Sequence, residues 1–293
     1  MKSVLLNYNH LPTPKQEAWK YTNLPKAMPQ GLTPSAQNEK TLIHIARGQE
    51  CGQTQDILWT GRDGTLHAPE LEIILEEGQE FTLVERHHGQ GTYWKNMATT
   101  ITLAKGAILH HIRIQGDSAV GVSTNMVKIV MERDAVYNGF TLNLGGKLTR
   151  HEIHAVMNGV NGECSFNGIN LLKDKQHGDT TILIEHKAPH GRSNQFYRTL
   201  LDDNARGVFQ GKVHVHQAAQ KTDGYQLSNA ILLSPGAEMD TKPELEIYAD
   251  DVKCSHGATT GQLDEAPLFY LRSRGLNEAE ARLLLLQAFV DEI

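Results

Sequence analysis

The chain has 293 residues, with 28 Lys and Arg against 34 Asp and Glu, and a formal net charge of −6. This charge does not favour a nucleic-acid partner, and no apolar run approaches the roughly 18 residues that a membrane-spanning helix needs. With 39% apolar and 21% charged residues, the composition is that of a soluble globular protein with a sizeable core.

Residues 1–39 are predicted to form an extension rather than a domain. Five prolines lie between Pro12 and Pro34, so regular structure should be limited to a short helix around Gln16 to Tyr21. The VLL run near the start is too short for the apolar core of a signal peptide, and no small-residue cleavage site follows it. We therefore expect a cytoplasmic protein.

The three cysteines support the same compartment. Cys51, Cys164 and Cys254 form no CxxC pair, and so sparse a set fits a reducing environment better than a disulfide framework. Nothing around Cys51 or Cys164 supplies a lowered pKa or a second ligand, so both are predicted to be structural.

Residues 40–261 read as a succession of strands, because short alternating apolar runs are broken by Gly, Asn and Asp. Similar starts recur 28, 28 and 29 residues apart, and after a slip of phase two more starts lie 29 residues apart. These starts are Gly106, Asp134, Gly162 and Gly191, then Gly207 and Gly236. Such a period indicates stacked units. A β-sandwich also fits, but the period favours a β-solenoid.

Residues 262–293 change to helical patterning, with helices expected over 264–275 and 277–293. Asn277 and Glu280 have the spacing of a capping box. The second helix carries more apolar surface than a short terminal helix normally hides. Packing on the end of the β domain and binding to a partner both explain this surface.

Several catalytic and nucleotide-binding motifs are absent from the sequence. It contains no GxxxxGK[ST], no GxGxxG after a strand, no GxSxG and no HExxH. We therefore expect no nucleotide site in this chain, and any nucleotide chemistry should belong to a partner.

Fifteen histidines raise the question of metal binding. On a strand, residues i and i+2 share a face, so His214 and His216 can converge, whereas His151 and His154 are less well spaced. A cupin-like metal-binding enzyme would use His214 and His216, and this is the alternative function. The segment QAAQKTD that follows His216 lacks the Glu that cupins show.

Cys254 and His256 are the strongest candidate ligands. They share one side of a strand, and a thiolate with an imidazole suits iron, copper or zinc. Stable coordination normally takes four ligands, so the remaining ligands must come from elsewhere in the fold or from another subunit. A structural Cys and a hydrogen-bonded His are the plainer interpretation of the same pair.

A family resemblance becomes specific at these residues. The segments DDVKCSHGATTGQLD (250–264) and LFYLRSRG (268–275), continued upstream over 220–252, are similar to the C-terminal signature of the SufB/SufD family. EAWKYTNL (17–24) resembles the N-terminal motif of SufD-type chains. Gly257 stands where SufB-type chains usually carry Glu, which favours the SufD type.

The resemblance implies a right-handed parallel β-helix over 40–261, with a short N-terminal extension and a C-terminal helical pair. It also implies a non-catalytic scaffold subunit that pairs with SufB through the β-helix cores and holds the ATPase SufC through the C-terminal helices. A homodimer is the corresponding expectation for the chain without SufB. A transient iron–sulfur cluster would be shared with SufB, and the complex could also take up a reduced flavin.

Carried over to this sequence, the resemblance makes His256 the cluster ligand and Cys254 its neighbour. A passive scaffold with a structural His256 is the alternative. The predicted SufC-binding residues all lie in the two C-terminal helices. They are Leu268, Phe269, Tyr270, Leu271, Arg272, Arg274, Leu284 and Phe289.

Overall fold

The computed structural model describes residues 5–35, 39–50 and 52–293. The prediction that Cys51 is structural falls outside these residues. Within them the strands form two sheets in which every pairing is parallel.

The two sheets are called sheet A and sheet B. Sheet A contains β1 (Thr33–Pro34), β2 (Lys40–Ile45), β4 (Thr65–His67), β5 (Glu70–Leu75), β7 (Trp94–Leu103), β9 (Val122–Met131), β11 (Leu148–Met157), β13 (His177–His186), β15 (Arg206–Val215) and β17 (Glu238–Ile247). Sheet B contains β3 (Gln53–Gly61), β6 (Glu80–Gly89), β8 (Ile108–Gly116), β10 (Val136–Asn143), β12 (Glu163–Leu172), β14 (Arg192–Leu201), β16 (Asp223–Leu232) and β18 (Lys253–Gly261).

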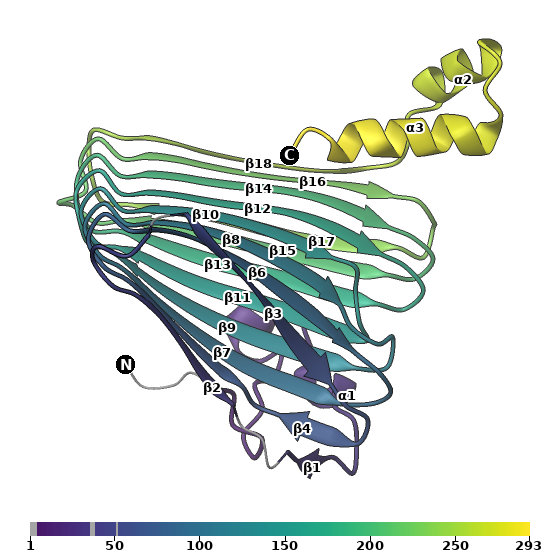
Figure 1. Cartoon of the computed structure of the whole chain (residues 1–293). Coiled ribbons are helices and arrows are strands. Elements are labelled where there is room, and N and C mark those ends of the chain that lie inside the picture. Colours follow the sequence, from purple (N-terminus) through teal and green to yellow (C-terminus); the bar gives the residue numbers. More distant parts are fainter. Residues whose placement is uncertain (1–4, 36–38, 51) are drawn as a thin grey trace.

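From β6 onward, successive strands alternate between the two sheets, so the chain coils into a parallel β-solenoid of about eight turns (Figure 1). The predicted solenoid is therefore confirmed over the sandwich. The slip in the sequence period also has an explanation. Gly106, Asp134, Gly162 and Gly191 precede strands of sheet B, whereas Gly207 and Gly236 mark strands of sheet A.

The space between the sheets, called the lumen, holds one long apolar cluster that includes Ile73, Ile101 and Ile129. It also holds charged side chains that contact neither solvent nor the outer faces. Lys95 pairs with Asp117 at 2.8 Å, and Glu85 lies 2.6 Å from His111. Since isolated buried charges are unstable, this pairing is what allows ionised groups in the core.

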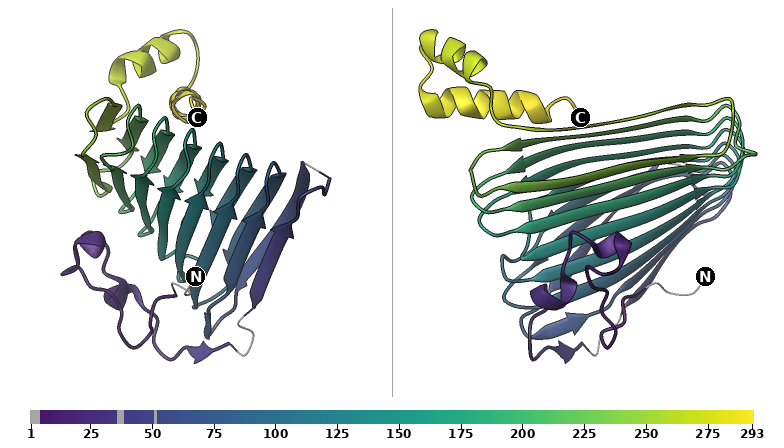
Figure 2. Two further views of the ribbon diagram at one scale, coloured as in Figure 1. Left: turned by 90° about the vertical axis from the view of Figure 1, so that its left-hand side faces the viewer. Right: turned by 180° about the vertical axis from the view of Figure 1, so that it is seen from behind.

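The N-terminal extension crosses the outer face of sheet A (Figure 2). It contains a 3₁₀ helix η1 (Glu17–Trp19) and the short helix α1 (Leu24–Ala27). Trp19 and Leu24 are buried against Trp94 and Val122 of the sheet. The predicted short helix is therefore present as a single 3₁₀ turn, and the extension is held down by apolar burial.

Two helices follow the last strand, α2 (Glu265–Ser273) and α3 (Glu278–Val290), and they lie beside the C-terminal end of the solenoid (Figure 1). The capping box of α3 is formed as predicted, since Asn277 and Glu280 bond each other's backbone N–H at 3.0 Å. In the described part of the chain, no helix has the length and apolar character to cross a membrane.

Candidate functional site

The candidate site lies at the C-terminal end of the solenoid, where the stack of strands stops. β17 pairs only with β15, and β18 pairs only with β16, among the described residues. The outer edges of both strands are therefore open. An open edge exposes backbone donors and acceptors that a further strand can pair with.

The backbone directions at this edge follow from the parallel ladder. Lys253 donates its N–H to Thr222 of the turn before β16, so alternate residues of β18 face β16. Cys254, His256 and Ala258 consequently direct their N–H and C=O groups to the open edge. In β17 the edge-facing set includes Pro243, which has no N–H to offer. The edge of β18 is thus the more complete pairing surface.

Cys254 and His256 share one face of β18, as predicted. Cys254 is in register with Gly224 and His256 with Gln226. Gln226 is 3% exposed and belongs to the lumen side of β16. Because paired residues of neighbouring strands share a face, both candidate ligands point to the mouth of the lumen.

The two candidate ligands differ in their surroundings. Cys254 is half-buried against Val213 and Leu245. This burial raises the pKa of its thiol, and a hydrogen bond from the backbone of Gly224 offsets only part of the effect. Cys254 is therefore a neutral thiol at pH 7 in the chain alone, whereas the imidazole of His256 is exposed. The histidine is the more accessible donor.

No group of three or more His, Cys, Asp or Glu able to hold a metal ion exists among the described residues. Cys254 and His256 can supply at most two ligands, so this edge can form only part of a metal or cluster site. Cys164 is buried in the lumen, where desolvation raises the pKa of its thiol and its Sγ lies 3.7 Å from Met157 Sδ. This placement agrees with a structural role.

The histidines of the alternative function lie elsewhere, on the outer face of sheet A. His214 stacks on His216 with ring centroids 4.3 Å apart. Glu185 accepts hydrogen bonds from His154 at 2.6 Å and from His216 at 3.2 Å. Sequence reasoning missed Glu185 as the centre of this cluster, although each partner lies 31 residues away, about one turn of the solenoid.

The predicted partner-binding residues of the helical pair divide into exposed and packed side chains. Phe269 and Tyr270 are 74% and 61% exposed, and Leu284, Arg272 and Arg274 are also exposed. Leu283, which the prediction did not include, is exposed as well.

The other members of that set serve internal packing. Leu268 is buried, and Leu271 is half-buried. Phe289 lies over the guanidinium of Arg198 in β14 at 4.5 Å, and Glu292 forms an ion pair with the same arginine. Phe289 therefore helps to attach α3 to the solenoid.

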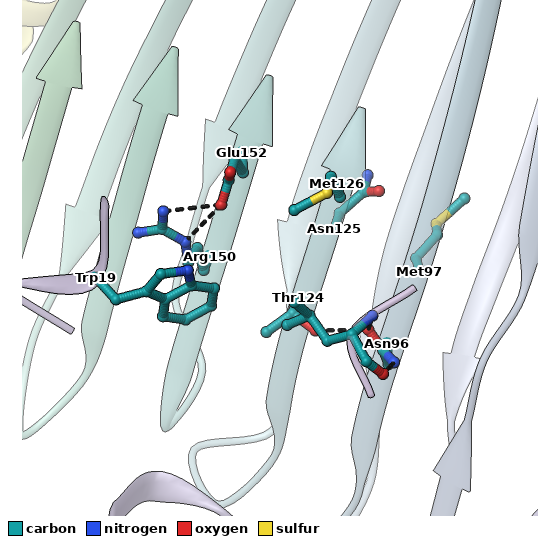
Figure 3. Close-up of a pocket in the computed structure, with 9 residues that line it drawn as sticks. Trp19, Asn96, Met97, Thr124, Asn125, Met126, Arg150 and Glu152 are labelled. Carbon is teal, nitrogen blue, oxygen red and sulfur yellow. Dashed lines mark hydrogen bonds and ion pairs between the residues drawn. The ribbon is translucent and has the colours of Figure 1, made fainter. Parts of the chain in front are cut away.

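A second feature is the small pocket under the N-terminal extension (Figure 3). Trp19 covers the guanidinium of Arg150 at 4.0 Å, and Glu152 accepts two hydrogen bonds from that guanidinium. Arg150 also forms an ion pair with the buried Asp179. The residues of this pocket therefore hold the N-terminal extension on sheet A. No sequence motif predicted this role for Arg150.

Fold and site together define a β-solenoid with an open edge that carries an exposed histidine and a half-buried cysteine. Residues 58–289 match the family model for the SUF system FeS cluster assembly, SufBD core domain. The chain therefore belongs to the SufB/SufD family of iron–sulfur cluster assembly proteins, and its resemblance is to the SufD type.

The similarity to individual relatives is extensive. The chain is 34% identical over 271 residues to the iron–sulfur cluster assembly protein SufD of Escherichia coli, covering 89% of this chain and 64% of that protein. It is 38% identical over 235 residues to an iron–sulfur cluster assembly SufBD family protein of Synechocystis, covering 77% of this chain and 52% of that protein. A Mycobacterium tuberculosis SufBD family protein is 31% identical over 268 residues, covering 88% of this chain and 67% of that protein. The chain thus spans about half to two thirds of the length of these relatives.

Proposed function

We propose that this chain is the SufD-like scaffold subunit of a SufB–SufC–SufD complex that assembles iron–sulfur clusters. In this role it performs no catalysis. It presents His256 to a nascent cluster at the edge where SufB pairs, and it offers α2 and α3 to the ATPase SufC. The cluster is cargo, shared with SufB, and ATP hydrolysis belongs to SufC.

The observation that carries the proposal is the coincidence of an open edge and a pair of donors at the same residues. The backbone groups of Cys254 and His256 face the open edge, while their side chains point to the mouth of the lumen. A partner strand added to β18 would therefore bring its own side chains next to His256. The side chains of the partner strand would supply the remaining ligands of the cluster, which Cys254 and His256 alone cannot provide.

The helical pair supports the assignment of a second partner. Phe269, Tyr270 and Leu283 are large apolar side chains that remain exposed on two adjacent helices. Large apolar side chains that remain exposed favour a protein interface. Arg198 connects the C-terminal helical segment to β14 through Phe289 and Glu292. A movement imposed on the helices would therefore reach β14, which lies two strands from β18 in sheet B.

The test is to co-express the chain with SufB and SufC, with His256 intact or replaced in His256→Ala, and to measure iron and sulfide in complexes isolated without oxygen. We expect His256→Ala complexes to assemble normally and to lose the bound cluster. Cys254→Ser serves as the matched variant and should retain more cluster. An unchanged cluster content in His256→Ala would mean that this subunit only supports its partner.

A further inference from the structure

The lumen directly behind His256 contains buried amides without hydrogen-bond partners. His256, Gln226 and Gln195 are in-register neighbours on β18, β16 and β14. Their side chains therefore form one row on the lumen face. Gln226 is 3% exposed and Gln195 is fully buried. Neither the amide nitrogen nor the amide oxygen of either residue has a partner among the described residues.

This row differs from a second row of lumen-facing amides in the same sheet. Four residues further along the strands, Asn143 donates to Asn170, and Asn170 donates to Thr199, at 3.2 and 3.1 Å. That ladder satisfies its own polar groups. A buried donor or acceptor left unpaired costs about 1–3 kcal/mol. The amides of Gln226 and Gln195 therefore remain available for a hydrogen bond that this structure does not show.

The geometry limits which group can pair with the amide of Gln226. Neighbouring strands lie about 4.8 Å apart, so Gln226 is the side chain of β16 nearest to the imidazole of His256. Gly224, in register with Cys254, brings no side chain. Gln195 reaches across the lumen, where its Oε1 lies 2.8 Å from the position that a Cβ on Gly211 would take. The amide of Gln226 is thus the group available to His256.

Resting on the function proposed above, we propose that Gln226 is a positioning residue for His256. Its amide oxygen accepts a hydrogen bond from one imidazole N–H, directly or through one water, and Gln195 orients that amide from behind. The other imidazole nitrogen then keeps its lone pair for iron or the nascent cluster. Ligand histidines commonly need such a partner to select one tautomer and one ring orientation.

The first measurement uses the full chain without partners. Histidine labelled with ¹⁵N reports the two neutral tautomers of His256 by NMR, and His256→Ala assigns its signals. Gln226→Leu should change the tautomer ratio by about threefold or more, the effect of losing one hydrogen bond. Gln226→Met, which keeps the length of the side chain, is the second variant in case Leu impairs folding. Ser228→Ala, a buried neighbour on the same face of β16, is the control and should leave the ratio unchanged.

The second measurement uses the complex with SufB and SufC. Gln226→Leu should lower iron and sulfide per complex by about tenfold at normal assembly, and Gln226→Glu, which keeps an acceptor, should restore them. If the tautomer ratio or the cluster content stays at the value of the unmodified chain, the role of Gln226 is wrong. If His256→Ala itself leaves the cluster in place, the proposed function fails instead, whatever Gln226 does.

Discussion

The charged residues in the lumen are the least expected side chains of this protein. Lys95 and Asp117 are 1% and 0% exposed, and Asp117 also accepts a hydrogen bond from Tyr93. Sequence patterning did not predict them, because on an alternating strand a lysine is normally assigned to the solvent face. The strand period identified which positions point inward, but it could not identify the charge that neutralises each buried group.

Lys95→Met should strongly destabilise the chain, because it leaves the buried carboxylate of Asp117 without its cation. We expect the free energy of unfolding to fall by about 3–5 kcal/mol, measured by urea denaturation followed by circular dichroism. The double variant Lys95→Met/Asp117→Asn removes both charges and keeps the acceptor for Tyr93, so it should recover most of the loss. A single variant as stable as the unmodified chain would contradict this.

Glu185 should make the stability depend on pH. Burial acts to raise the pKa of its carboxyl, but hydrogen bonds from His154 and His216 outweigh burial and hold the pKa at about 2. Because this pKa lies below its ordinary value of 4.5, the stabilisation is complete above that value and is lost as the pH falls toward 2.

The corresponding variant is Glu185→Gln. It should be about 1 kcal/mol less stable than the unmodified chain at pH 7, after allowance for solvent screening, and the difference should shrink between pH 4.5 and pH 2. Urea denaturation at several pH values measures this. His154→Ala, which removes one of the two donors, should show a smaller difference. A difference independent of pH would show that Glu185 acts through packing alone.

At the scale of elements, the repeat period favoured the solenoid over a sandwich, the family resemblance implied a parallel β-helix, and helical patterning predicted the helical pair. The capping box of Asn277 and Glu280 could be predicted from the sequence because it depends on two residues only three positions apart. The packing of the N-terminal extension could not be predicted from the sequence, because the hydrogen bond from Arg150 to the Ala18 carbonyl joins residues 132 positions apart. Long-range contacts of this kind leave no local pattern.

Trp19 should decide whether the extension stays on sheet A. Trp19→Ala removes a buried ring that covers Arg150, and large aromatic truncations of this kind cost about 3–5 kcal/mol. We expect amide hydrogen exchange to accelerate over residues 17–27, with little change in β13 and β15. Lys20→Ala, an exposed neighbour, is the control. Unchanged exchange in Trp19→Ala would show that other contacts hold the extension.

At the scale of the whole molecule, the described residues form a stack whose last strands, β17 and β18, each keep one unpaired edge. Sequence reasoning located Cys254 and His256 because an i, i+2 pair on a strand is a local feature. It did not find Gln226 or Gln195, which become neighbours of His256 only through the register of β14, β16 and β18. The proposed site is therefore a product of stacking, one residue from each successive turn.

Ala258→Pro tests the open edge directly. Ala258 faces its N–H away from β16, so proline removes a donor from the edge without removing a bond of the β16–β18 ladder. We expect the chain to fold with an unchanged circular dichroism spectrum and to bind SufB about tenfold or more weakly in co-purification or titration, because strand addition depends on backbone hydrogen bonds.

Thr241→Pro is the matched variant on β17, where the edge already lacks a donor at Pro243. Its effect on SufB binding should be smaller if β18 is the main pairing strand. Equal losses from both variants would mean that the partner extends both sheets together. Binding unaffected by Ala258→Pro would mean that the partner meets the side chains at the mouth of the lumen rather than the strand edge, and His256 would then reach its cluster without β-pairing.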